Sequence, residues 1–142
     1  MAARLRYDEV EVGTALPSTR FPITRLDLVR YAGASGDFNE IHWNERVARE
    51  VGLPDVIAHG NLTMALAGRV LTSWAGDPEA LVEYGVRFTK PVVVPDDGVG
   101  ATLLVEGVVK EKLEDGCVRV ELTVTSEGVR VLGQARAVIR LT

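Results

Sequence analysis

Apolar and polar residues alternate with a period of two through most of the second half of the chain, which is the pattern of half-buried β-strands. The alternation occupies four segments, at residues 82–88, 102–112, 118–125 and 129–139. Asp115-Gly116, between the second and third segments, is a strong signal for a tight hairpin, and Glu127-Gly128 marks the next turn. We therefore expect a run of antiparallel strands in this half.

The first half instead carries helix-capping residues and helical spacing. Thr24 and Asp27 have the spacing of a capping box, in which each side chain bonds the backbone N–H of the other residue. Apolar residues follow at helical spacing, at Leu26, Val29 and Ala32. Asn44 is expected to cap a second, short helix that stops at Gly52.

A third helix, expected over residues 60–74, is apolar on most sides and has Arg69 as its first charged residue. A helix with so little polar surface is a buried helix. Helices that precede a run of antiparallel strands predict an α+β fold with the helices on one face of the sheet. We expect the sheet to wrap around the 60–74 helix.

A short strand near Ser18–Ile23 completes the expected sheet. Pro17 and Pro22 lack a backbone N–H, so this strand is expected at an edge. An open sheet leaves its outer strands unpaired, and pairing of these edges in a dimer is one way to cover them.

The 142 residues are 46% hydrophobic and 25% charged, and we expect one domain over residues 1–142. The net charge of −4 and the lack of a basic patch argue against nucleic acid as a partner. Cys117 is the only cysteine, which excludes an internal disulfide and a cysteine zinc site. No apolar run reaches the ~20 residues that cross a bilayer, and the N-terminus is charged, so we expect a cytoplasmic protein without membrane contact.

The stretch with the richest chemistry is Tyr31–Trp43, which reads YAGASGDFNEIHW. It places Asp37 and His42 on one turn-rich loop, where a carboxylate and an imidazole can face one small volume as a general acid/base pair. Ser35, Asp37 and Asn39 also suit a turn in which side chains bond the nearby backbone, and this structural interpretation stays open.

The second histidine, His59, precedes Gly60 at the start of the apolar helix. The first N–H groups of a helix lack internal partners and carry partial positive charge, and a glycine lets a carbonyl oxygen approach them closely. Gly60 is therefore a candidate oxyanion site. Structural alternatives stay open for both residues, because His59 can serve as a packed side chain and Gly60 as a packing glycine.

Metal and cofactor sites are not expected. Ligand atoms are available on Asp37, Asn39, His42 and His59, but the helix-borne ligand pairs of zinc enzymes are missing. The sequence also lacks a phosphate loop, a dinucleotide fingerprint and a Gly-x-Ser-x-Gly elbow.

The segment from Tyr31 to His42, followed by Ala58-His59-Gly60, resembles the hydratase motif of the MaoC-like (R)-specific enoyl-thioester hydratases and dehydratases. Residues 86–91 are similar to the R-F-x-x-P strand end of that family, and length and element order agree over nearly the whole chain. The greatest likeness is to the B-type catalytic subunit of the (3R)-hydroxyacyl-acyl carrier protein dehydratases of type II fatty-acid synthesis, which rests also on residues 72–78 and 95–98. One position departs from the motif, because Glu40 stands where the family usually has proline.

The resemblance implies a hot-dog fold, in which an antiparallel sheet wraps a long helix, and a homodimer or a heterodimer with a related hot-dog subunit. It implies reversible hydration of trans-2-enoyl thioesters, carried on CoA or acyl carrier protein, to (3R)-3-hydroxyacyl thioesters. Asp37 and His42 would activate the water, and the Gly60 N–H would bind the thioester oxygen. Asn39 would hold the loop and hydrogen-bond within the site. Ser35 and His59 would lie behind these residues rather than contact the substrate.

Two other functions stay open. A hot-dog acyl-thioesterase would use the carboxylate to direct water at the thioester carbon, and a non-catalytic subunit would only bind acyl chains or stabilise a catalytic partner. The order Ser-Gly-Asp-x-Asn-x-x-His favours the hydratase. A subunit that only binds would have no need of both Asp37 and His42.

Overall fold

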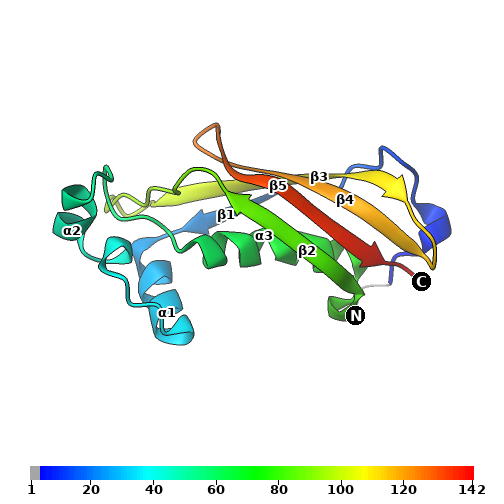
Figure 1. Ribbon diagram of the computed structural model, residues 1–142, viewed down its shortest axis with the longest axis horizontal. Coiled ribbons are helices and arrows are strands. Elements are labelled where there is room, and N and C mark those ends of the chain that lie inside the picture. The colour runs from blue at the N-terminus through cyan, green and yellow to red at the C-terminus, as the bar shows by residue number, and fades with distance from the viewer. Residues whose placement is uncertain (1–3) are drawn as a thin grey trace.

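The computed structural model describes residues 4–142 and sets one long helix against a five-stranded antiparallel sheet (Figure 1). The helices are α1 (Arg25–Ser35), α2 (Glu45–Glu50) and α3 (Gly60–Ala75), with short 3-10 turns at Tyr7–Glu9, Glu40–His42 and Pro78–Ala80. The strands are β1 (Thr19–Ile23), β2 (Leu81–Phe88), β3 (Ala101–Lys112), β4 (Cys117–Ser126) and β5 (Val129–Arg140). Their order in the sheet is β1-β3-β4-β5-β2. The predicted α+β class is confirmed.

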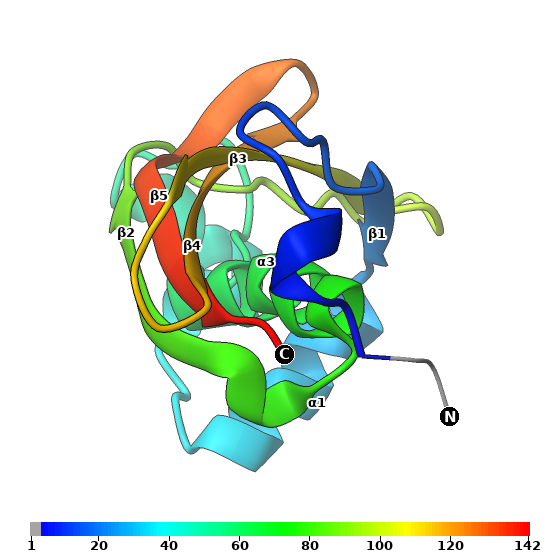
Figure 2. The same cartoon turned by 90° about the vertical axis from the view of Figure 1, so that its right-hand side faces the viewer.

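The sheet curls around α3, as the view along the helix shows (Figure 2). The helix buries a face that includes the small residues Ala67 and Gly68 together with Leu71. Small residues let the sheet come close: a Cβ added to Gly68 would lie 3.1 Å from the ring of Tyr84 on β2. The prediction that the sheet wraps α3 is therefore confirmed, although the helix is not buried on all sides and keeps an exposed row at Asn61, Ala65, Arg69 and Ser73. The helix ends at Gly76 in the left-handed conformation that glycine favours.

Tight turns join the last three strands where the sequence predicts them. Asp115 and Gly116 both have positive φ, at 58° and 72°, and so do Glu127 and Gly128, at 51° and 73°. Two successive left-handed residues are the mark of the type I′ hairpin turn, whose twist matches that of the strands it joins.

The start of α1 agrees with the sequence, but its packing face does not. The Thr24 side chain accepts the N–H of Asp27, and the Asp27 carboxylate accepts the N–H of Thr24, as expected of a capping box. The expected apolar stripe is wrong, because Leu26 and Val29 are more than half exposed. The helix instead buries Leu28 with Ala32, a pair that shares one helix face at a spacing of four.

The two edge strands of the sheet are β1 and β2. β1 pairs only with β3, which confirms the edge position predicted from its prolines. Among the described strands β2 pairs only with β5, and Val82 and Phe88, near its two ends, are about half exposed. None of the helices within residues 4–142 combines the length and the apolar character that crossing a membrane takes.

Candidate active site

The loop that follows α1 is held by its own polar side chains. The Ser35 hydroxyl accepts the N–H of Asp37 at 3.1 Å, and the Asp37 Oδ1 atom accepts the N–H of Asn39 at 3.2 Å. The Asn39 side chain in turn accepts the N–H of Ile41 at 3.2 Å. The turn chemistry predicted as an alternative is therefore real, yet it uses only one carboxylate oxygen of Asp37 and leaves Oδ2 free.

That free oxygen faces His42. The Asp37 Oδ2 and His42 Nε2 atoms are 3.9 Å apart, with the carboxylate side chain half exposed and the imidazole 8% exposed. The other ring nitrogen, Nδ1, lies 2.7 Å from the carbonyl oxygen of Ile57. Because a carbonyl can only accept, Nδ1 carries the proton and neutral His42 presents an Nε2 lone pair on the Asp37 side.

His59 lies directly behind this pair. Its Nε2 donates to the Asp37 carbonyl oxygen at 3.1 Å, and its ring stacks on that of His42 with centroids 3.8 Å apart and planes 22° from parallel. Burial, as the largest cause, lowers the pKa of His59 below its usual 6.5, with a smaller contribution from neighbouring His42 and an opposing one from the Asp37 bond. His59 is therefore neutral near pH 7.

Gly60 opens α3 next to the pair. The N–H groups of Leu62 and Thr63 both bond the His59 carbonyl, whereas the Gly60 N–H has no partner among residues 4–142. Gly60 does not have positive φ, so conformational freedom is not the reason for glycine here. An added Cβ would lie 2.9 Å from the Phe88 ring, so space is the reason.

Asp37, His42 and Gly60 open onto one cleft of about 440 Å³. Its walls come from parts of the segments 37–42, 57–63, 88–92 and 131–132, which belong to the loop after α1, the start of α3, the end of β2 with the loop after it, and β5. Ser35, Asn39 and His59 are not among the residues that line it. The wall built by Phe88 at the end of β2 follows no catalytic pattern in the sequence, although residues 86–91 carry part of the family resemblance.

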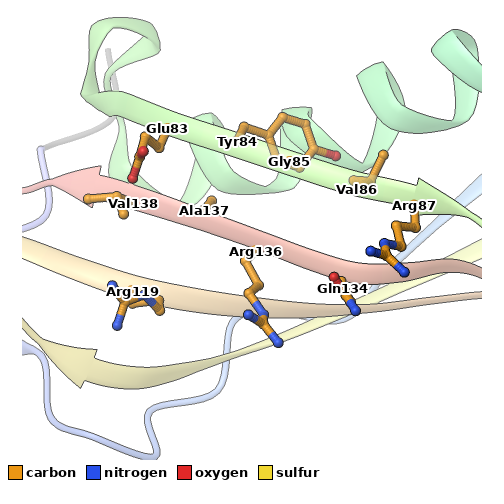
Figure 3. A pocket seen from close by; sticks show the side chains of 10 residues that line it. All are labelled: Glu83, Tyr84, Gly85, Val86, Arg87, Arg119, Gln134, Arg136, Ala137 and Val138. Atoms are coloured by element: carbon orange, nitrogen blue, oxygen red, sulfur yellow. The ribbon is translucent and has the colours of Figure 1, made fainter.

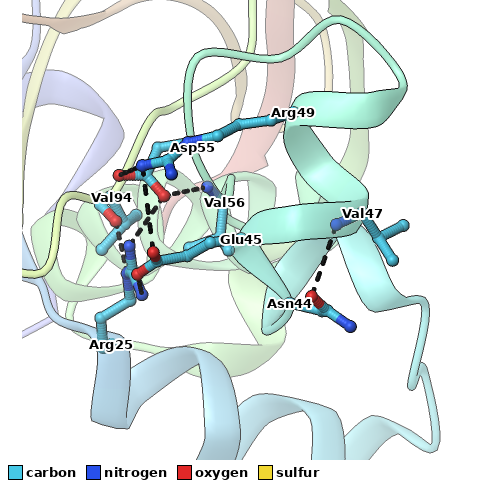
Figure 4. Close-up of polar contacts among 8 residues, drawn as sticks. All are labelled: Arg25, Asn44, Glu45, Val47, Arg49, Asp55, Val56 and Val94. Atoms are coloured by element: carbon cyan, nitrogen blue, oxygen red, sulfur yellow. Dashed lines mark hydrogen bonds and ion pairs between the residues drawn. The ribbon is translucent and has the colours of Figure 1, made fainter.

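An arginine anchors the segment that supports His42, a role with no signal in the sequence (Figure 4). Arg25, the first residue of α1, donates to the Val94 carbonyl at 2.6 Å and to the carboxylates of Glu45 and Asp55, both at 2.9 Å. Asp55 belongs to the loop before α3, and two residues later the Ile57 carbonyl fixes the His42 ring. Arg25 thereby ties α1, α2 and that loop together.

Glu40, the position that departs from the motif, is bonded in place. Its carboxylate accepts a hydrogen bond from the Asn44 side chain at 2.9 Å, and its carbonyl accepts the N–H groups of Trp43 and Asn44. These bonds stiffen the chain after Asn39 without a proline ring.

Asp37, His42 and His59 bring three ligand-type atoms within 4.8 Å of one another. A metal ion binds imidazole in the plane of the ring, along the nitrogen lone pair. Two rings stacked at 3.8 Å and 22° direct their lone pairs side by side rather than at one point. The geometry therefore suits an acid/base pair with a packed neighbour better than a shared metal.

A second depression, of about 450 Å³, lies on the face of the sheet turned away from α3 (Figure 3). Arg87, Arg119 and Arg136 line it from three neighbouring strands, with Glu83 beside them. Arg119 forms an ion pair with Glu111. Although this hollow is slightly larger, neither of the two histidines lines it, and we place the candidate active site in the cleft beside Asp37.

The sequence model of the MaoC like domain matches residues 10–128. The chain belongs to the MaoC-like family. A 3-hydroxyacyl-thioester dehydratase X of Mycobacterium tuberculosis is 43% identical over 79 residues, which are 56% of this chain and 27% of that protein. An (R)-specific enoyl-CoA hydratase of Rhodospirillum rubrum is 36% identical over 107 residues, which are 75% of this chain and 73% of that enzyme.

Solved structures of MaoC-like proteins share the fold. A MaoC-like dehydratase superposes with a TM-score of 0.94 and 38% identity over 98% of this chain and 43% of its own. The unliganded R-hydratase PhaJ1 of Pseudomonas aeruginosa superposes with a TM-score of 0.83 and 31% identity, over 97% of this chain and 86% of its own. The predicted hot-dog fold is thereby confirmed. This chain spans less than half the length of the mycobacterial dehydratase and of the MaoC-like dehydratase.

Proposed function

We propose that this MaoC-like chain catalyses the reversible hydration of trans-2-enoyl thioesters to (3R)-3-hydroxyacyl thioesters. The observation that carries the proposal is the meeting of Asp37 Oδ2, His42 Nε2 and the unpartnered Gly60 N–H at one cleft. These are a carboxylate and an imidazole lone pair, which can take up a proton and return it, and an oxyanion donor, the set that proton transfer beside a carbonyl requires.

Water would bind between Asp37 and His42, whose facing atoms are 3.9 Å apart. As the water oxygen bonds C3 of the enoyl group, one water proton passes to the pair and the thioester oxygen takes up enolate charge. The Gly60 N–H would stabilise that charge. The pair then delivers one proton to C2, so that one water is added and no net proton is consumed. Dehydration runs through the same steps in reverse.

We propose further that residues 1–142 form one domain and that two such units, either identical or related, pair to form a dimer. The edge position of β2 supports this, because its backbone pairs with β5 alone among the described strands and its apolar residues Val82 and Phe88 are about half exposed. The dimer predicts a mass of about twice 15.4 kDa in solution. An active particle with the mass of one chain by light scattering would contradict it.

The reaction is tested by mixing the purified protein with crotonyl-CoA, and separately with crotonyl-acyl carrier protein, while enoyl absorbance and free thiol are recorded together. Loss of absorbance without thiol release is the expected result, and chiral analysis should find the (3R) product. Thiol release would identify a thioesterase instead. Neither change, with the assembled dimer and both carriers, would leave the acyl-binding subunit as the better description.

A further inference from the structure

The His59 side chain contacts both members of the proposed catalytic pair but does not line the cleft. It is 1% exposed, so substrate cannot reach it. His59 is the N-cap of α3, a position that favours Ser, Thr, Asn or Asp, yet its side chain makes no capping bond. Helix capping therefore does not explain a histidine at this position.

The contacts of the ring define its protonation. Nε2 donates to the Asp37 carbonyl, so the proton of the neutral ring lies there and Nδ1 holds the lone pair. Nδ1 is buried and has no hydrogen-bond partner within the described part of the chain. A second proton on Nδ1 would be buried and unpaired, beside the stacked ring of His42. The remaining neighbours are the Asp37 carboxylate and the ring of Tyr31, which packs edge-on with centroids 4.8 Å apart.

We propose that His59 is a positioning residue, whose neutral ring holds the Asp37 backbone through Nε2–H and the His42 ring plane through stacking. The position of the Asp37 backbone sets where its carboxylate stands, and the plane of His42 sets where Nε2 points. One side chain thereby fixes both ends of the 3.9 Å gap that would hold the water. This role rests on the hydration activity proposed above.

The neutrality of His59 also limits which groups can hold a proton during the reaction. Because the ring takes no second proton, the proton taken from water has only Asp37 and His42 to reside on before it moves to C2. His59 itself donates no proton to the substrate, since it lies outside the cleft.

Three variants separate the two contacts of His59. His59→Gln keeps an N–H donor at the reach of Nε2 but loses the ring, His59→Phe keeps a stacking ring but loses the donor, and His59→Ala loses both. Each is assayed for kcat and KM on crotonyl-CoA beside a thermal melt. His59→Phe should lower kcat by about 10- to 100-fold, as a misplaced catalytic group does, with KM little changed. His59→Ala should be slowest, and His59→Gln should recover much of the loss seen with Phe.

The melts distinguish positioning from simple packing. His59→Phe removes the buried Nδ1 that has no partner but also the bond to the Asp37 carbonyl, and because these two effects oppose each other its melting temperature should stay close to that of the wild type. If packing were the whole role, rate would follow stability, and a folded His59→Phe protein with wild-type kcat would overturn the proposal. Inactive wild-type protein would instead contradict the hydration function.

A measurement on the unaltered protein keeps the proposal testable if a variant does not fold. Nitrogen NMR of histidine-labelled wild type should show one ring with its proton on Nε2 and none on Nδ1 from pH 8 down to pH 6. Proton exchange onto Nδ1 of His59 within that range would overturn the neutral positioning role.

Discussion

The Nε2 atom of His42 lies 3.9 Å from the Oδ2 atom of Asp37, a separation too long for a direct hydrogen bond and short enough for one water to contact both. Each partner is fixed from behind, Asp37 by the Asn39 N–H and His42 by the Ile57 carbonyl. The pair is therefore arranged before substrate arrives.

Replacement of either partner should abolish most turnover. We expect Asp37→Asn and His42→Ala each to lower kcat for crotonyl-CoA hydration by on the order of 10²-fold or more. Asp37→Asn should melt like the wild type, because an amide oxygen can still accept the Asn39 N–H. Near-normal turnover in folded Asp37→Asn would remove Asp37 from the mechanism.

Gly60 should be sensitive to any added side chain. We expect Gly60→Val to lower turnover by roughly 10²–10³-fold, the loss seen when one oxyanion donor is removed. Stability should fall by only about 1 kcal/mol, because Phe88, whose ring the new Cβ meets, is 57% exposed and can turn outward.

The control for Gly60 makes space for the new side chain. Gly60→Ala is compared in the wild-type background and in Phe88→Ala, with Phe88→Ala alone as reference. A loss of rate that persists after the ring is removed supports the oxyanion role. Full recovery of rate in the double variant would show that the ring displacement, rather than the blocked N–H, caused the loss.

Arg25 should matter for both stability and rate. Its side chain is 24% exposed and its Asp55 partner 18%, so Arg25→Ala leaves a largely buried carboxylate with only its longer ion pair to Arg49, at 3.9 Å, and should cost about 2 kcal/mol of unfolding free energy. Because the Asp55 loop leads to the Ile57 carbonyl, kcat should also fall, by about 10-fold.

Arg46→Ala is the matched control, since Arg46 and Glu50 form an ion pair of similar length that is well exposed. Its loss should cost less than about 0.5 kcal/mol and leave kcat unchanged. Denaturant unfolding and crotonyl-CoA turnover measure both variants. Equal effects of the two substitutions would contradict the anchoring role of Arg25.

The buried His59 predicts a loss of stability in acid. Because burial lowers its folded pKa from 6.5, the unfolded chain binds a proton below about pH 6.5 that the folded protein does not bind. Stability should therefore fall as pH drops through this value, and be fully present above it. Unfolding free energies at pH 7.5, 6.5 and 5.5 should show a shallower decline in His59→Phe, and identical declines would refute the assignment.

Local patterns account for what the sequence predicted of the fold. A sheet with one buried face requires alternation, so Val118 through Val124 could be assigned from period alone, and the Thr24–Asp27 box spans a single helical turn. The α1 stripe failed because Leu26 and Leu28 both lie in rows of helical spacing, and only tertiary packing decides which row is buried.

The candidate site, like the fold, was predictable from the sequence only where its residues lie close together along the chain. Asp37 and His42 sit five positions apart on one loop, so their spacing was informative. The Ile57 carbonyl, the stack of His59 on His42 and the bonds of Arg25 to Glu45 and Asp55 join segments that are remote in sequence. Such contacts exist only in the folded chain, and no single-segment pattern encodes them.

The topology of the sheet has a consequence for the order of assembly. β3, β4 and β5 are joined by two tight turns, so their pairing closes short loops at little entropic cost, whereas β2 must find β5 across the whole β3–β4 hairpin. The cleft needs Phe88 from the end of β2 and Gly60 from α3. A refolding chain will therefore hold much of its sheet while it still has no catalytic pocket, and activity will be the last property to return.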